Sequence, residues 1–261
     1  MSVRANIRRR RMIGGNNTTI KKHPYQVAIE FKFGGNFCSG VIISIQHVLT
    51  AAHCLNFTKD FLQIRSGSSL RDEGGTLHDV VQIKLHELFR LDDKYENSYF
   101  DIGLASVNPP FSYDDTRRPI ALNKLILPSS YETDRKLVVT GWGVVDHKNT
   151  SAHQLQALEV PWHSKEWCNK TYEKFGGLHE GQICTGYVGV RDMEACPGDS
   201  GDPLVIDDVL VGIVIYGEGD CGRLDYPTVY TEVAYFIEWI THSYYSMFHR
   251  KRSHRRVYLP K

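Results

Sequence analysis

The chain has 261 residues, of which 41% are apolar and 23% charged, so it is long enough to bury a sizeable core and is not a low-complexity protein. Basic residues without any acidic residue mark both ends, five in 1–11 and six in 249–261, which leaves 20 basic and 30 acidic residues in 12–248. Such basic ends are typically solvated, and no apolar run is long enough to span a membrane.

Short segments that favour β-strands dominate the body of the chain. They are rich in β-branched and aromatic residues and are separated by Gly, Asn, Asp or Pro, which is typical of an all-β sandwich or barrel. In chain order the predicted strands are Tyr25–Phe33, Val41–Leu49, Phe61–Gly67, Val80–Leu85, Lys136–Val144, Gln154–Pro161, Pro203–Ile206, Val209–Tyr216 and Thr228–Glu232. One helix is predicted over Val233–Phe248, because Ile237, Ile240 and Tyr244 share a face at helical spacing.

The cysteines and glycosylation sequons both indicate a secreted protein. An even number of cysteines at loop-sized spacing favours three disulfide bonds, although six cysteines allow 15 pairings. The cysteines are Cys38, Cys54, Cys168, Cys184, Cys196 and Cys221. Five Asn-x-Ser/Thr sequons begin at Asn16, Asn17, Asn56, Asn149 and Asn169. The first residues contain no apolar segment of a signal peptide, so we expect a secreted glycoprotein whose signal peptide is missing from this sequence.

Three short segments carry residue types suited to nucleophilic catalysis. LTAAHC contains His53, FDIGL contains Asp101, and CPGDSGDPLV contains Ser200 in a glycine-rich turn. A serine hydroxyl needs a base within hydrogen-bond reach and a third group that orients the base. The N–H groups of Gly198 and Ser200 are candidates for the two donors that an oxyanion requires. Taken singly, each segment also has a structural explanation as a packed histidine, a capping aspartate or an ordinary turn.

Taken together, the segments resemble the chymotrypsin/trypsin family over residues 12–248. The matching segments are RMIGG at 11–15, HPYQVAI at 23–29, LTAAHC at 49–54, FDIGLASV at 100–107, GWG at 141–143, QICTGY at 182–187, CPGDSGDPLV at 196–205, LVGIVIYG at 210–217 and PTVYTEV at 227–233. The resemblance implies two antiparallel six-stranded β-barrels with a C-terminal helix. It also implies that Ser200 attacks the scissile carbonyl, His53 transfers the proton and Asp101 orients His53, with no cofactor or metal.

The resemblance further implies disulfide pairs and a zymogen. The implied pairs are Cys38–Cys54, Cys168–Cys184 and Cys196–Cys221. Cleavage after Arg11 would free the amine of Met12 to pair with Asp199, so 1–11 is expected to be a propeptide remnant, 12–248 the peptidase domain and 249–261 a basic tail. The expected partners are protein or peptide substrates, an activating protease and protein inhibitors of a monomeric enzyme, without nucleic acid.

Several residues depart from the family pattern. The mature chain would begin with Met12 instead of Ile or Val, Asp202 replaces a glycine after the nucleophile, and Ile215 replaces a serine that commonly hydrogen-bonds the catalytic aspartate. If that glycine takes positive φ, Asp is among the less costly substitutes. An active endopeptidase is the leading hypothesis, and the alternative is a protease-like binding or decoy protein with little hydrolysis.

The specificity pocket leaves two substrate preferences open. By resemblance it contains Glu194 at its base, with Tyr216, Gly217 and Thr228 on its walls. An acidic base favours Arg or Lys before the scissile bond, whereas Thr228 in place of a glycine narrows the pocket and favours a small residue. The sequence does not decide between them.

Overall fold

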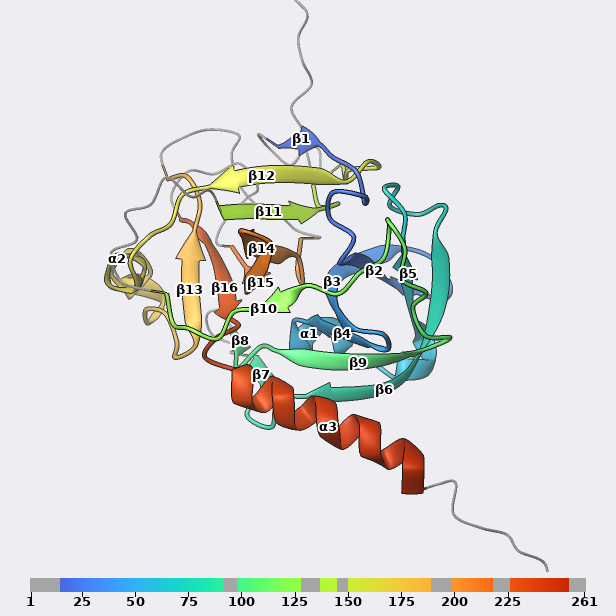
Figure 1. Ribbon diagram of the computed structural model, residues 1–261. Coiled ribbons are helices and arrows are strands. Elements are labelled where there is room, and N and C mark those ends of the chain that lie inside the picture. The colour runs from blue at the N-terminus through green and yellow to red at the C-terminus, as the bar shows by residue number, and fades with distance from the viewer. Residues whose placement is uncertain are drawn as a thin grey trace, which may run out of the picture.

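The computed structural model describes residues 15–91, 98–127, 137–144, 150–188, 199–217 and 226–253, with side chains to residue 248. Two β-sheets lie side by side, and helix α3 (Ile237–Ser253) runs along the outside of the first (Figure 1). His47 of the first sheet and Tyr244 of α3 meet edge to face, with ring centroids 4.8 Å apart. No helix in the described part of the chain combines the length and apolarity needed to cross a membrane.

The first sheet is a closed, antiparallel, six-stranded barrel in the order β2-β3-β4-β9-β6-β5. Its strands are β2 (Gln26–Phe31), β3 (Asn36–Ser44), β4 (His47–Thr50), β5 (Leu62–Ser66), β6 (Thr76–Leu85) and β9 (Gly103–Asn108). Alternate residues such as Val27 and Ile29 on β2 and Ile64 on β5 are fully buried in one apolar core. Burial of these side chains is the main stabilising term of the barrel.

The second sheet has the strand order β1-β12-β11-β14-β15-β16-β13, with β10 paired to β15. Its strands are β1 (Asn16–Asn17), β10 (Ala121–Leu122), β11 (Leu137–Gly141), β12 (Gln156–Val160), β13 (Gln182–Thr185), β14 (Pro203–Ile206), β15 (Val209–Tyr216) and β16 (Thr228–Glu232). The strands from β12 to β13 follow one another in this order, and an antiparallel bridge joins the two end strands. It pairs Trp162, just after β12, with Thr185 of β13. That bridge closes a second ring of six strands, which confirms the predicted fold class.

The remaining elements are short and lie on connections within each barrel. They are α1 (Ala52–Leu55), α2 (Lys165–Thr171), the 3₁₀ turns η1 (Lys59–Phe61) and η2 (Glu173–Phe175), and the two-stranded ribbon β7 (Arg90–Leu91) and β8 (Ser98–Tyr99). Sequence analysis did not predict α2. Its signal was a serine cap, since Ser164 Oγ accepts from the N–H of Trp167 at 3.1 Å.

Several predicted boundaries are wrong, and β6, for example, begins at Thr76 and not at Val80. The single strand predicted over Val41–Leu49 is a tight hairpin of β3 and β4, in which Ser44 pairs with His47 and its hydroxyl hydrogen-bonds His47 Nδ1 at 2.8 Å. The apolar run hid the turn because both arms of the hairpin are buried. The predicted helix begins four residues too early, since turns occupy 233–236 before α3 begins at Ile237.

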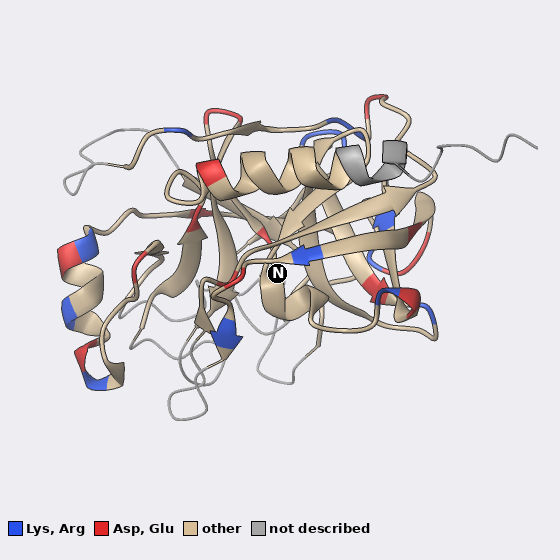
Figure 2. Cartoon of the chain, turned by 90° about the horizontal axis from the view of Figure 1, so that it is seen from below, with Lys and Arg blue, Asp and Glu red and all other residues tan. Residues whose placement is uncertain are grey.

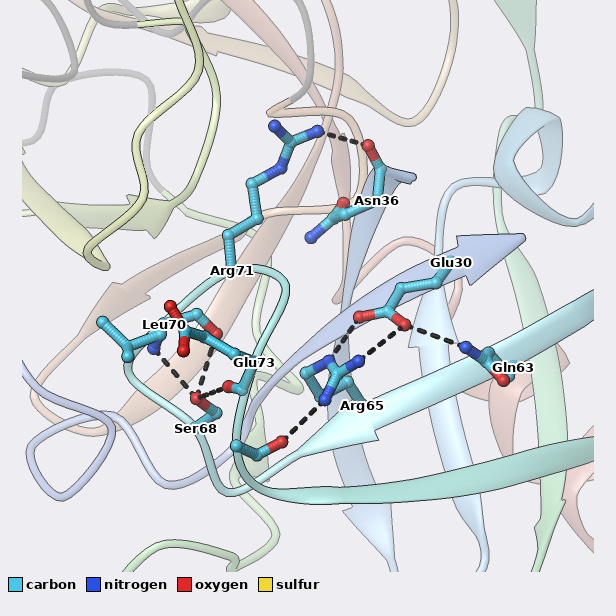
Figure 3. Close-up of polar contacts among 9 residues, drawn as sticks. Glu30, Asn36, Gln63, Arg65, Ser68, Leu70, Arg71 and Glu73 are labelled. Atoms are coloured by element: carbon cyan, nitrogen blue, oxygen red, sulfur yellow. Dashed lines mark hydrogen bonds and ion pairs between the residues drawn. The ribbon is translucent and has the colours of Figure 1, made fainter. Parts of the chain in front are cut away.

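Two arginines tie the loop between β5 and β6 to the first barrel (Figure 3). Arg65 donates from Nε to Glu30 Oε1 at 2.5 Å and from Nη1 to the carbonyl oxygen of Gly74 at 2.7 Å. Both charged side chains of this pair are largely buried, so each compensates the other where water is scarce. Arg71 donates to the carbonyl oxygen of Asn36, the first residue of β3, and so holds a strand on which the candidate site is built.

Charged residues lie mainly on the loops and helix ends. Figure 2 shows both signs interspersed along these segments of the described chain, while most of the barrel strands carry neither. Among the described residues, the acidic side chains therefore lie on several separate segments in this view.

Candidate active site

His53 is positioned by α1, which follows β4 directly. Ala51 and Ala52 are fully buried, and these small residues let the helix pack closely on β9, where a Cβ on Gly103 would lie 3.3 Å from the Cα of Ala52. The disulfide Cys38–Cys54 then joins α1 to β3. This predicted pairing is confirmed, and it fixes the residue after His53 to the neighbouring strand.

Asp101 occupies a tight turn between β8 and β9. Phe100 has φ of 49°, an uncommon conformation for an aromatic residue, and the N–H of Ile102 donates to the carbonyl oxygen of Phe100 at 2.9 Å. Phe100 stacks on His86 with ring centroids 5.0 Å apart. Thr231 Oγ1 donates to the carbonyl oxygen of Asp101 at 2.7 Å, so the second barrel also holds this residue.

The carboxylate of Asp101 binds His53 through both oxygens. Oδ2 lies 2.6 Å from His53 Nδ1, and Oδ1 accepts from the backbone N–H of His53 at 2.9 Å. The Asp101 side chain is fully buried, whereas that of His53 is 26% exposed. Burial lowers the pKa of His53, but the charge of Asp101 and the hydrogen bond to it outweigh burial, so the pKa lies above 6.5. The ring is therefore oriented, with Nδ1 directed at the carboxylate and Nε2 on its other side.

Ser200 lies on the turn that leads into β14. Its carbonyl oxygen accepts from the N–H of Ser39 at 2.8 Å. The next residue, Gly201, has φ of +84°, and a Cβ there would lie 2.0 Å from the carbonyl oxygen of Ser39. Only glycine fits this position, because the turn must both adopt a left-handed conformation and approach β3 closely.

The three predicted catalytic residues therefore reach one region between the barrels. Ser200 is hydrogen-bonded to Ser39, the residue after Cys38, and the disulfide partner of Cys38 directly follows His53. Asp101 is bonded to His53 through Nδ1, while Nε2 of the ring lies 3.6 Å from Cys54 Sγ. Thus a strand and a helix of the first barrel meet a turn of the second.

Asp199, expected to bind the new N-terminus, is fully buried. Its Oδ1 accepts from the backbone N–H of Gly143 at 2.8 Å, within the GWG segment noted in the sequence. Arg11, Met12 and the oxyanion residue Gly198 lie outside the described residues.

The predicted pocket residues are described in part. Thr228 is buried on β16, paired with Thr185 of β13, while Tyr216 is half-buried at the end of β15 and Gly217 follows it. Glu194 and the predicted disulfide Cys196–Cys221 fall outside the described residues. The disulfide Cys168–Cys184 is confirmed, and it links α2 to β13.

Asp202 and Ile215, which differ from the family pattern, are both buried. Asp202 is fully buried and is not among the described residues with positive φ, so the conditional case of a positive φ at this position does not apply. Ile215 is 4% exposed and belongs to the apolar core. Its side chain can contribute packing but no hydrogen bond.

The sequence motifs did not identify two residues that hold Asp202, Gln26 directly and Thr140 through Gln26. Gln26 Nε2 donates to Asp202 Oδ1 at 2.9 Å, and Thr140 Oγ1 donates to Gln26 Oε1 at 2.7 Å. No motif marks Gln26 in the sequence, because Glu30 and Lys32 are further polar residues of the same predicted strand. Buried polar groups of this kind need partners.

One cluster of possible metal ligands lies at the site. Ligand atoms of Cys38, His53 and Cys54 lie within 4.8 Å of one another in the described part of the chain. Because the two sulfurs are bonded to each other, neither is the thiolate that a metal requires. This cluster is therefore a disulfide beside a histidine.

Comparison with known proteins gives consistent matches. The sequence model of the Trypsin family matches residues 12–240. The chain is 34% identical to Trypsin 5G1 of Aedes aegypti, over 88% of this chain and 84% of that protein. It is similar to the structure of neuropsin, a serine protease from mouse brain, with a TM-score of 0.76 and 28% identity, covering 88% of this chain and 98% of the other. A scabies mite inactivated protease paralogue shares the fold, with a TM-score of 0.74 and 24% identity, over 89% and 97% of the two chains.

Proposed function

Since this chain belongs to the trypsin family of serine endopeptidases, we propose that it cleaves peptide bonds with Ser200 as nucleophile, His53 as general base and Asp101 as the group that orients His53. The observation that carries this proposal is the double contact of Asp101 with His53, at 2.6 Å to Nδ1 and 2.9 Å to the backbone N–H. A histidine held in this way presents Nε2 to a proton donor.

In the proposed reaction, His53 removes the Ser200 proton as Oγ attacks the substrate carbonyl. The tetrahedral oxyanion then accepts hydrogen bonds from the N–H groups of Gly198 and Ser200. His53 returns the proton to the leaving amine, and water releases the acyl group by the same steps in reverse. The buried negative charge of Asp101 stabilises the imidazolium that forms in each half-reaction.

Activation is proposed to follow cleavage after Arg11. The new α-amino group of Met12 would enter the buried site of Asp199 and pair with its carboxylate. A charge buried as deeply as that of Asp199 is stabilised best by an opposite charge with good geometry. Pairing there would order the turn of Ser200, because the two residues are adjacent.

We place the enzyme outside the cell. Two disulfides in the described residues suit an oxidising compartment, and the sequon residues Asn16, Asn17, Asn56 and Asn169 are exposed, as glycosylation requires. The substrates proposed are therefore extracellular proteins or peptides, and the enzyme would meet its activating protease and protein inhibitors there.

The direct test is labelling with a serine-directed phosphonylating probe. The full chain is cleaved after Arg11 and incubated with the probe, and mass spectrometry locates the adduct. We expect stoichiometric labelling at Ser200, no labelling of Ser200→Ala, and little labelling of the uncleaved chain. Absence of labelling above the Ser200→Ala control would favour a binding or decoy protein with this fold.

The same preparation separates the two substrate preferences. A peptide library that varies the residue before the scissile bond reports whether Arg and Lys or small residues are preferred. If Glu194 contacts a basic side chain, Glu194→Gln loses that preference. If Thr228 limits the pocket, Thr228→Gly broadens the accepted size instead.

A further inference from the structure

Two fully buried carboxyl groups lie on the turn that carries Ser200. Asp199 precedes the serine, Asp202 follows it by two residues, and both are 0% exposed. The N–H of Asp202 donates to the carbonyl oxygen of Asp199 at 2.9 Å, so the two residues close a single turn. The family resemblance leads one to expect glycine at 202, and the second carboxyl group is therefore a feature of this chain.

The glycines of the segment 141–143 accommodate both acids. A Cβ on Gly141 would lie 1.6 Å from Oδ2 of Asp202, and a Cβ on Gly143 would lie 2.1 Å from Oδ1 of Asp199. The two carboxyl groups therefore lie against backbone positions two residues apart. A side chain at either glycine would displace an acid from its place beside the turn.

The two oxygens of Asp202 have different surroundings. Oδ1 accepts from Gln26 Nε2 at 2.9 Å, and the hydroxyl of Thr140 fixes the orientation of that amide by donating to its oxygen at 2.7 Å. Oδ2 is buried and accepts no hydrogen bond of normal geometry within the part of the chain that the structure describes, although the Ser39 hydroxyl lies near enough to Asp202 to lower its pKa. A buried carboxylate with one undonated oxygen is costly, whereas a carboxylic acid carries a donor of its own.

Burial and the neighbouring negative charge both favour the protonated form of Asp202. Burial has the largest effect on the pKa of Asp202 and raises it well above its usual value, and both the charge of Asp199 and hydrogen bonding with it raise it further, while Ser39 and Gln26 act in the opposite direction. Tyr230 on β16 faces both acids, and burial chiefly, together with their charges, raises its pKa, so it stays neutral. Two carboxyl groups that share one buried site do not both ionise readily, and the α-amino group of Met12 proposed to pair with Asp199 after cleavage would offset only one of the two charges.

We propose that Asp202 is a positioning residue of the nucleophile turn, which keeps its proton and donates it in a hydrogen bond to the carboxylate of Asp199. The N–H of Gly143 holds Asp199 from one side at 2.8 Å, and the Asp202 acid holds it from the other. This inference rests on the proposed function, since the turn so fixed carries Ser200. When Asp202 loses its proton at high pH, the two carboxylates repel each other and the turn loses its geometry.

The test compares Asp202→Asn, Asp202→Ala and wild type as the full chain cleaved after Arg11. Asparagine keeps a neutral donor of the same shape, whereas alanine removes it. We expect Asp202→Ala to lower kcat about tenfold with little change in KM. Asp202→Asn should recover most of the wild-type kcat. Wild type should show a fall in kcat at alkaline pH, and Asp202→Asn should not. Asp207→Asn, the same change at an exposed position of the following turn, is the matched control.

A second measurement reports the proton itself and needs no activity. The infrared spectrum of wild type at neutral pH should contain the C=O band of a protonated carboxyl group, which Asp202→Asn lacks and Asp207→Asn retains. An identical acid band in wild type and Asp202→Asn would overturn the proposal, as would equal loss of kcat in the Asn and Ala variants. If wild type shows no Ser200-dependent turnover, the proposed function fails, while the infrared comparison still decides where the proton is.

Discussion

At the residue scale, the site depends on contacts that reach across the chain. His53, Asp101 and Ser200 were identified from short motifs, because each motif combines a reactive side chain with small neighbours. Gln26 and Thr140 were not, because a hydrogen bond between residues 114 positions apart leaves no local pattern. The positive φ of Phe100 likewise depends on tertiary stacking. Motifs therefore yield candidate reactive groups, whereas the residues that hold them become visible only in the structure.

The His53–Asp101 pair predicts a definite pH dependence. His53 acts as a base only when neutral, so kcat/KM should rise with pH through a pKa above 6.5. Asp101→Asn removes the charge that raises this pKa, so the rise should move to lower pH while the rate falls by up to about 10⁴-fold. The same pair stabilises the fold fully below pH 6.5 and loses that contribution as the pH rises through the folded pKa. A pH profile unchanged in Asp101→Asn would contradict this assignment.

At the element scale, strand boundaries were predicted to the residue where a clear turn separates two strands. They were missed where the turn lies within a buried apolar run. Pro203–Ile206 and Val209–Tyr216 match β14 and β15, because Asp207 and Asp208 between them adopt the positive φ of a two-residue hairpin. The β3–β4 hairpin was missed because Ser44 and His47 lie within one buried apolar run. The start of α3 was displaced because helical spacing continues into the preceding turns.

The two described disulfides provide a matched pair at this scale. Both have a sequence separation of 16 residues, so the chain-entropy model gives each about 3 kcal/mol of stability. Only Cys38–Cys54 joins the helix of His53 to the strand that binds Ser200. Replacing either pair by alanines should lower the free energy of unfolding similarly, whereas only Cys38→Ala/Cys54→Ala should lower kcat when assayed well below its melting temperature. Equal effects on kcat would show that the first disulfide has no special role in the site.

At the scale of the whole molecule, the proposed site lies where the two barrels meet. Residue patterns indicated an all-β chain, but periodicity does not determine that a ladder closes on itself, as the Trp162–Thr185 bridge does here. The number of barrels followed from family resemblance. The first barrel supplies His53, the second supplies Ser200, and Asp101 is held by both, through His53 and Thr231.

Joint action of residues from both barrels is the central claim, and a double-variant cycle tests it most directly. Single-turnover rates are measured for His53→Ala, Ser200→Ala and the combined variant, with melting curves to confirm folding. If the two residues act as one unit, the combined variant should be no slower than the slower single variant, within about threefold. Losses that multiply in the combined variant would show that His53 and Ser200 act independently, and the proposed mechanism would be wrong.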